Sequence, residues 1–283
     1  MKEKIAILTD SSSSIYQKEH DYNNLFMIDL PCYIGEEVYT GFLKNGDKPF
    51  YEAFSKTSLV PKTSQPSIGE TLEMYEKIKS LGYTHIIYLP ISKELSGTYI
   101  NGHASKDLVE GIIIEIVDTR RTASILGAIA FEAARMAKEG SSFNDIIKQV
   151  IKMRDKSVYY VTVNDLTPLV KNGRLSNAKS LIAKLFRIKP VIKLNEEGKL
   201  LSIATVRTYK GAMREIVNRS LEEFDSNTGV LHISYTGIEA DLEYFTTLID
   251  EQLPNCKKEV YFVPSTVVAH LGLSSIAIGY VHY

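Results

Sequence analysis

The sequence has no tryptophan, only two cysteines and no long apolar run, and these absences exclude several classes of protein. Its 283 residues carry 33 basic and 34 acidic side chains, for a net charge of -1, so no strong general field draws the chain to nucleic acid or to an anionic membrane. No apolar run approaches the roughly 18 residues that span a bilayer, and the charged first residues lead into a short strand rather than a signal peptide. Cys32 and Cys256 stand in separate apolar neighbourhoods. We therefore expect a soluble, cytoplasmic protein with two reduced, buried thiols.

Motifs for several common kinds of catalysis are also missing. There is no G-x-x-x-x-G-K-[ST] phosphate loop, no G-x-G-x-x-G after a strand and no H-E-x-x-H. G-x-S-x-G and C-x-x-C are absent too. The six histidines are scattered and lack the spacing of metal ligands. Nucleotide binding, serine hydrolysis and metal catalysis are therefore disfavoured, and we expect neither a metal nor a cofactor.

What the sequence does contain is an alternation of apolar strands and amphipathic helices. Strands are predicted over residues 4–9, 85–90, 111–118, 157–163, 189–195, 200–206, 229–235, 258–263 and 274–283. Helices are predicted over residues 68–82, 121–140, 209–224 and 239–253. This alternation predicts two α/β domains with mostly parallel sheets, residues 1–155 and 156–283, separated at the charged stretch KMRDKS. A cleft between two such domains is a common place for a ligand.

Polar clusters follow several of the predicted strands. LTDSSSS (8–14) and ISKELSGTY (91–99) place hydroxyl groups at strand ends, and Gly97 in the second stretch allows a close approach of the backbone to a ligand. Serines in such places more often cap a helix or hold a turn. Asp10 is a candidate catalytic acid, although an aspartate that closes a strand more often holds a turn. Both interpretations stay open at this point.

The stretch KTSQPSIGE (62–70) divides into two parts. Ser67 and Glu70 have the S-x-x-E spacing of a capping box, in which each side chain bonds to the other residue's backbone N–H. Ser67 is therefore predicted to be structural. Thr63 and Ser64 are assigned to no cap, and they stand just upstream of a helix N-terminus. They are candidate donors to an anion.

Two further candidates lie in the second half of the chain. In LVKNGRLSNAKSLIAKLF (169–186), Asn172-Gly173 predicts a tight turn and Ser176 a helix cap, which would hold Arg174 at a helix entrance where an anion is favoured. A solvated surface arginine is the competing interpretation. His270 stands in the apolar stretch VVAHLGLSS, where an isolated histidine is more often a hydrogen-bonded core residue than a ligand-binding one.

Taken in order, these clusters resemble one family from end to end. The pieces are LTDSSSS, KTSQPS, ISKELSGTY, VDTRRTASILG, LVKNGRLS, KPVI and a C-terminal histidine. The chain resembles the DegV family, the fatty-acid-binding subunits of bacterial fatty acid kinase. The resemblance implies a hydrophobic tunnel for one long-chain fatty acid, with its head-group site at the domain junction. It assigns the carboxylate to Thr63, Ser96, Arg174 and His270, with Ser64 as a neighbour of Thr63.

The resemblance also implies a role without chemistry of its own. The bound acid would be presented to a separate ATP-dependent kinase subunit, which makes an acyl phosphate for phospholipid synthesis, and transient membrane contact is compatible with that role. One departure stands out: where the family often has H-x-G-P-G, this chain reads His270-Leu271-Gly272-Leu273-Ser274. The alternatives are a small-molecule phosphotransferase or hydrolase that acts through the serine cluster, Asp10 and Arg174, or a regulatory module for another carboxylated ligand.

Overall fold

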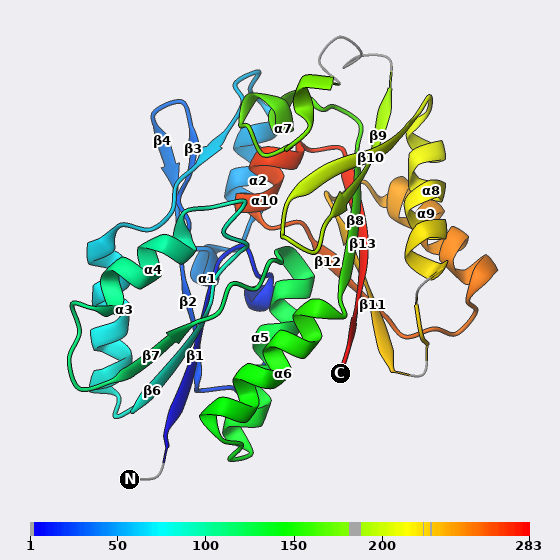
Figure 1. The fold of residues 1–283 in the computed structure, drawn as a ribbon. Coiled ribbons are helices and arrows are strands. Elements are labelled where there is room, and N and C mark those ends of the chain that lie inside the picture. The colour runs from blue at the N-terminus through cyan, green and yellow to red at the C-terminus, as the bar shows by residue number, and fades with distance from the viewer. Residues whose placement is uncertain (1–2, 181–187, 223, 227) are drawn as a thin grey trace.

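A parallel sheet forms the first half of the molecule. The computed structural model describes residues 3–180, 188–222, 224–226 and 228–283 (Figure 1). The first sheet has the strand order β2-β1-β6-β7, and its neighbours all pair in parallel. Its strands are β1 (Ile5–Asp10), β2 (Leu25–Ile28), β6 (His85–Leu89) and β7 (Ile113–Ile116). Every residue of β1 is buried, as expected of a central parallel strand covered on both faces.

The second sheet is mixed. It has the order β10-β9-β8-β13-β11-β12. Its strands are β8 (Val158–Val163), β9 (Lys189–Leu194), β10 (Leu200–Val206), β11 (Gly229–Tyr235), β12 (Lys258–Phe262) and β13 (Ser275–His282). Among the described residues, only β11 and β12 pair in parallel in this sheet. The expectation of mostly parallel strands is confirmed for the first sheet and wrong for the second. The reason is clearest at β9 and β10, which are joined by a tight turn at Asn195–Gly198, because a connection that short can join only antiparallel strands.

Two helices, α5 (Ala123–Lys138) and α6 (Phe143–Asp155), lie side by side between the two sheets, and α6 contacts β6 and β13 (Figure 1). The more deeply buried of the two is α5. It contacts β1 on one side and β11 and β13 on the other, and most of its side chains are buried. Its many alanines suit this place, because small side chains let a helix approach two sheets closely. Outside this layer lie α3 (Ile68–Ser80), α4 (Thr98–Lys106), α8 (Tyr209–Glu222) and α9 (Glu239–Gln252), with α8 and α9 on the far face of the second sheet (Figure 1).

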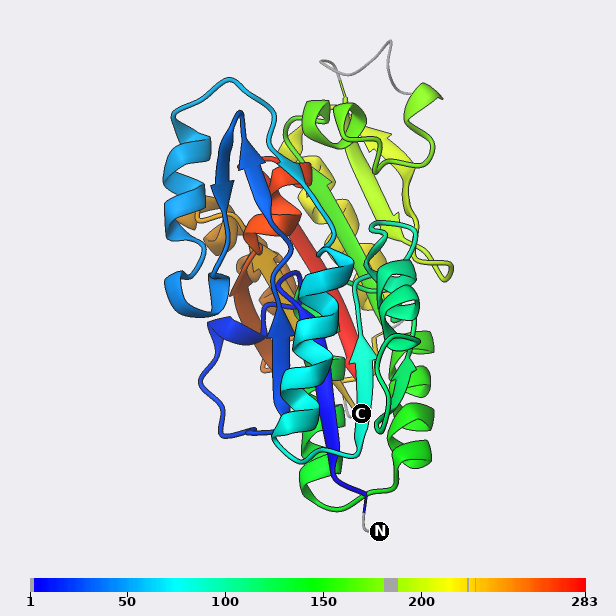
Figure 2. The same ribbon diagram turned by 90° about the vertical axis from the view of Figure 1, so that its left-hand side faces the viewer.

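A small third sheet stands where the two halves meet. It has the order β4-β3-β5 and lies beside α10, as Figure 2 shows. The elements of this region are β3 (Cys32–Ile34), β4 (Glu37–Tyr39), β5 (Lys62–Thr63), α1 (Phe42–Asn45), α2 (Lys48–Ser55), α7 (Thr167–Lys171) and α10 (Ser265–Leu271). The contacts of α10 with β5 and α7 bring together three segments that are far apart in the chain. No sequence pattern predicted this sheet.

The structure also bears on the helix expected after Ser176, on the two cysteines and on the expected domain boundary. The 3-10 helices η1 (Ile15–Gln17) and η2 (Ala178–Ser180) complete the described elements; the rest of the helix expected after Ser176 falls on residues 181–186, outside the described residues. Both cysteines are free, but Cys256 is only half-buried, which corrects the expectation of two buried thiols. Apolar residues from both sides of residue 155 share one core cluster, so the division into two domains there stays a prediction. No helix in the described part of the chain is long and apolar enough to cross a membrane.

Candidate functional site

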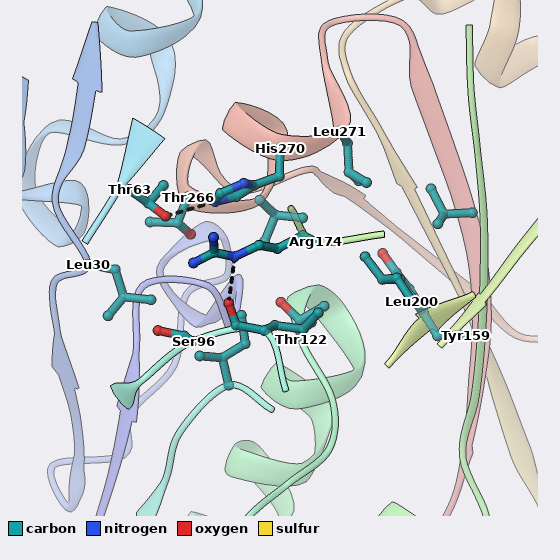
Figure 3. A pocket seen from close by; sticks show the side chains of 14 residues that line it. Leu30, Thr63, Ser96, Thr122, Tyr159, Arg174, Leu200, Thr266, His270 and Leu271 are labelled. Carbon is teal, nitrogen blue, oxygen red and sulfur yellow. Dashed lines mark hydrogen bonds between the residues drawn. The ribbon is translucent and has the colours of Figure 1, made fainter. Parts of the chain in front are cut away.

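A slender pocket lies between the two large sheets and the small third sheet (Figure 3). The volume open to the centre of a water molecule inside this pocket is about 50 Å³. Its apolar lining consists of Leu30, Ile91, Leu95, Val161, Leu200, Val267 and Leu271. Its polar lining consists of Thr63, Ser96, Thr122, Tyr159, Arg174, Thr266 and His270. Both halves of the chain therefore contribute, and four of the five predicted head-group residues meet here.

Thr63 and His270 are in direct contact across the pocket. Thr63 on β5 and His270 on α10 share a hydrogen bond of 2.8 Å between Oγ1 and Nε2. The other ring nitrogen of His270, Nδ1, is buried and has no hydrogen-bond partner among the described residues. Burial, helped by the positive charge of Arg174, lowers the pKa of His270 to about 4. The ring is therefore neutral near pH 7, and one of its nitrogens is left for a ligand.

Arg174 is held by backbone carbonyl groups. Its Nε donates to Leu95 O at 3.1 Å and its Nη1 donates to Asn172 O at 2.7 Å, which uses two of its five N–H groups. Within the described ranges, no carboxylate forms an ion pair with it. The half-buried guanidinium thus brings an uncompensated positive charge to the pocket, where an anion would relieve the cost of burial.

Asn172 fixes the turn that carries Arg174. Its side-chain Nδ2 donates to Pro61 O at 3.0 Å and to Ala269 O at 3.2 Å, while Gly173 takes the positive φ of 67° that the turn needs. The turn is thereby tied both to the chain just before β5 and to α10. The Asn-Gly signal predicted the turn. It did not reveal that the Asn172 side chain ties this turn to the two segments that carry Thr63 and His270.

Ser96 lines the pocket just ahead of α4. Its hydroxyl pairs with that of Thr98 at 2.8 Å, which leaves it able to form a further bond to a ligand. The neighbouring Gly97 serves another purpose than the predicted approach to a ligand. A Cβ there would overlap with the side chain of Gln65, so this glycine lets the KTSQPS stretch pack against the start of α4.

Thr266 is a pocket residue that the sequence analysis missed. It precedes His270 by one helical turn on α10, so both side chains face the same way. It is only 5% exposed, and in the described part of the chain its hydroxyl has no hydrogen-bond partner. The four-residue spacing from His270 is the signal that could have found it. In the described part of the chain, Thr266 Oγ1 and His270 Nδ1 have no hydrogen-bond partner, and both residues line the same pocket as Arg174 (Figure 3).

Ser64 and Ser67 do not reach this pocket. Ser64 is exposed, donates its hydroxyl hydrogen to Gln65 O at 2.8 Å and lines a separate surface hollow. Ser67 forms the predicted capping box: its Oγ accepts from Glu70 N at 3.1 Å, and its N–H donates to Glu70 Oε2 at 2.7 Å. The structure therefore confirms the structural role of Ser67 and does not bring Ser64 to the other candidates.

Asp10 is enclosed at the end of β1. It is fully buried and accepts hydrogen bonds from Ser12 N, Ser12 Oγ and Ile91 N at 3.0, 2.6 and 2.7 Å. Burial raises its pKa above the ordinary value. It does not line the pocket. These bonds join the ends of β1 and β6, so Asp10 holds a turn and has no route to a substrate in this structure.

The loop after His270 closes without the Pro-Gly pair of the family pattern. Gly272 ends α10 with a φ of 82°, which favours glycine. The hydroxyl of Thr236 then donates to Leu273 O at 2.6 Å and accepts from Ser275 N at 3.2 Å. A threonine from the end of β11 thus holds the segment that proline and glycine would otherwise shape.

Replacing Ser67 with alanine should lower the free energy of unfolding by about 1 kcal/mol, because α3 loses the acceptor for its first turn. Ligand binding should not change, since Ser67 lies outside the pocket. Urea unfolding together with ligand titration checks both points. Thr63→Val is the matched change, four residues earlier at a residue that lines the pocket, and it should weaken ligand binding instead. Equal effects of the two changes on binding would contradict this separation of roles.

Replacing His270 with glutamine should make stability less dependent on pH. His270 and the buried His232 both have pKa values lowered from 6.5 to about 4. Between these pH values the unfolded chain binds protons that the folded chain refuses, so the free energy of unfolding falls as the pH falls. His270→Gln should reduce that slope by up to about 1.4 kcal/mol per pH unit. Urea unfolding at pH 7, 6 and 5 measures it, and an unchanged slope would show that His270 titrates normally in the folded protein.

Comparisons with known proteins agree on one family. Residues 4–282 match the DegV family, which is described as a family of uncharacterised proteins. A DegV domain-containing protein of Staphylococcus aureus is 31% identical over 284 residues, which cover 98% of this chain and 97% of that protein. One from Streptococcus pyogenes is 29% identical over 279 residues and 98% of each chain.

Solved structures extend the similarity to the whole fold. A fatty-acid-binding DegV family protein from Streptococcus agalactiae has a TM-score of 0.92 and 27% identity, and the match covers 99% of both chains. DegV from Bacillus subtilis, described as a fatty acid binding protein, has a TM-score of 0.88 and 27% identity over 99% of this chain and 100% of that one. In the described part of the present chain, no group of three or more His, Cys, Asp or Glu residues could hold a metal ion.

Proposed function

This chain belongs to the DegV family, and from that premise we propose that it binds one long-chain fatty acid in the pocket of Figure 3. The observation that carries the proposal is a pocket rich in leucine, isoleucine and valine that also holds Arg174, a neutral His270 and Thr266. Among the described residues, Arg174 has no ion-pair partner and the Thr266 hydroxyl has no hydrogen-bond partner. A carboxylate with an aliphatic tail has the complementary chemistry. The fatty-acid-binding relatives in Streptococcus agalactiae and Bacillus subtilis support the same ligand class.

Affinity and orientation come from different parts of such a ligand. A tail of sixteen carbons buries roughly fifteen carbon groups at about 0.8 kcal/mol each, or on the order of 12 kcal/mol of gross transfer energy. A hydrogen bond to the charged head group adds only about 1.5–3 kcal/mol. The tail therefore supplies the affinity. Thr63, Ser96, Arg174 and His270 decide which end of the ligand lies at the pocket's polar side.

We further propose that the bound acid is handed to a separate ATP-dependent kinase, which phosphorylates the carboxyl group for phospholipid synthesis in the bacterial cytoplasm. The absence of a nucleotide-binding motif from the sequence supports a presenting role. Under this proposal the chain has no turnover of its own. It binds, shields and presents the acid.

Denaturing mass spectrometry of the purified protein tests the binding proposal. One fatty acid per chain should be released. Delipidated protein should then take up hexadecanoic acid in a titration. Recovery of an empty protein that also fails to take up the added acid would refute the proposal.

An enzyme acting through Asp10 and Arg174 is the second candidate, but the burial of Asp10 weighs against it. Incubation of the chain alone with ATP and a fatty acid distinguishes the two. The presenting role predicts no acyl phosphate without an added fatty acid kinase. Turnover by the isolated chain would favour the enzyme.

A further inference from the structure

Two buried hydroxyl groups in the pocket lie outside the proposed carboxylate site. Thr122 and Tyr159 are 4% and 2% exposed and both line the pocket. Within the described residues, Thr122 Oγ1 has no hydrogen-bond partner, and Tyr159 Oη has only the Ser234 hydroxyl nearby, outside normal hydrogen-bond geometry. Burying a hydroxyl without a partner is costly, and native proteins rarely leave such groups unsatisfied. Two of them in one narrow pocket call for an explanation.

Thr122 occupies a place where its hydroxyl would normally be used. It is the N-cap residue of α5, and a threonine there usually accepts a hydrogen bond from the first turn of its helix. Here its side chain forms no capping bond. The following Ala123 has a φ of 51°, which is unusual for a residue other than glycine. Figure 3 shows Thr122 at the start of α5 among the side chains that line the pocket, so the hydroxyl is available to a ligand rather than to its own helix.

Tyr159 enters the pocket from β8, next to Leu200 (Figure 3). Its ring packs over Gly279 on β13, where an added Cβ would clash with the ring. Burial raises the pKa of Tyr159 to about 12, partly offset by the nearby Ser234. The Ser234 hydroxyl pairs with that of Ser124 at 3.1 Å. Tyr159 is therefore protonated at neutral pH and can donate a hydrogen bond into the pocket.

We infer that the preferred ligand carries an oxygen on its chain close to the carboxylate, as a 3-hydroxy fatty acid does, and that Thr122 and Tyr159 bind this oxygen. The inference rests on the proposed function. We place that oxygen near the carboxylate because Thr122 and Tyr159 line the same pocket as Arg174 and His270, the residues proposed to bind the carboxylate. A site with buried hydrogen-bonding groups discriminates against a ligand that leaves them unpaired, so an unsubstituted acid binds less tightly.

Titration of the delipidated protein with four matched acids tests this inference. Hexadecanoic acid, the separate enantiomers of 3-hydroxyhexadecanoic acid, and 16-hydroxyhexadecanoic acid have the same chain length and differ only in the added oxygen. One 3-hydroxy enantiomer should bind about tenfold more tightly than hexadecanoic acid, as expected for one to two added hydrogen bonds. The 16-hydroxy acid should bind no better than hexadecanoic acid.

Thr122→Val and Tyr159→Phe identify the residues responsible, because each removes a hydroxyl and keeps the shape of the side chain. Each variant should reduce the preference, and the double variant should bind both acids equally while hexadecanoic acid binds as well as before or better. The inference would be overturned if the wild type bound hexadecanoic acid and both 3-hydroxy enantiomers with equal affinity, as expected when water already satisfies the two hydroxyls. A preference that survives in the double variant would also overturn it. In both cases the binding of hexadecanoic acid would leave the proposed function standing, whereas failure of every acid to bind would refute both.

Discussion

Replacing Arg174 with alanine should slow phosphorylation of the bound acid by a fatty acid kinase roughly a hundredfold, while the affinity for the acid falls only about tenfold. The guanidinium is the positive charge of the pocket, held by Leu95 O and Asn172 O. Losing it removes a charge-assisted hydrogen bond from the carboxylate, worth about 1.5 kcal/mol for this half-buried group, or roughly tenfold in affinity. The tail contributes several times more, so the acid stays bound. Its carboxylate is then no longer held in one orientation for the kinase. The rate of phosphorylation falls because the reaction depends on a correctly oriented carboxylate.

The experiment compares two measurements on the same variant. Titration with hexadecanoic acid gives the affinity, and acyl phosphate formation at saturating acid gives the rate. Arg219→Ala is the matched control, because Arg219 lies on α8, pairs with Glu215 and does not line the pocket. It should change neither quantity. Equal losses of affinity and rate in Arg174→Ala would contradict the division of labour between tail and head group.

Four of the five head-group candidates named from the sequence line one pocket, but the sequence did not predict the contacts between them. Thr63 and His270 are 207 positions apart, and no periodicity or turn signal could show that their side chains are in contact. They were named because each belongs to a motif of a known family. The links that hold the site together, such as Asn172 to Ala269, depend on how α10 packs against β5 and α7. That packing is a property of the tertiary structure and leaves no local pattern.

For the fold, too, local patterns could be predicted from the sequence and tertiary arrangement could not. Strands and helices with a strong period, such as β1 and α3, were predicted close to their observed bounds. The direction of the strands in the second sheet was not, because a run of apolar residues is the same whether its neighbour is parallel or antiparallel. The third sheet was missed since β3, β4 and β5 have at most three residues each. Strands that short are too brief to show an alternation.

Gly127 is the residue at which a single methyl group should cost most stability. It lies within α5, where alanine normally gains up to about 1 kcal/mol over glycine. Here an added Cβ would overlap with the carbonyl oxygen of Ser13. That oxygen belongs to the backbone of the LTDSSSS loop, where Ser13 N also donates to Asp10 O at 3.0 Å. The loop cannot yield without disturbing the end of β1, so α5 itself would have to move.

Gly127→Ala should therefore lower the free energy of unfolding by about 3 kcal/mol, at the upper end of the cost of overpacking a core. Gly69→Ala is the matched control, because Gly69 lies in α3 and an added Cβ there meets nothing closer than Ser67 Oγ at 3.9 Å. It should leave stability unchanged or raise it by up to about 1 kcal/mol. Urea unfolding of the two variants beside the wild type gives the comparison. A stabilising effect of Gly127→Ala would mean that α5 and the serine loop can separate without loss. In that case the glycine of VDTRRTASILG would not be explained by close packing, and the position of Thr122 at the start of the same helix would be less firmly held than the structure indicates.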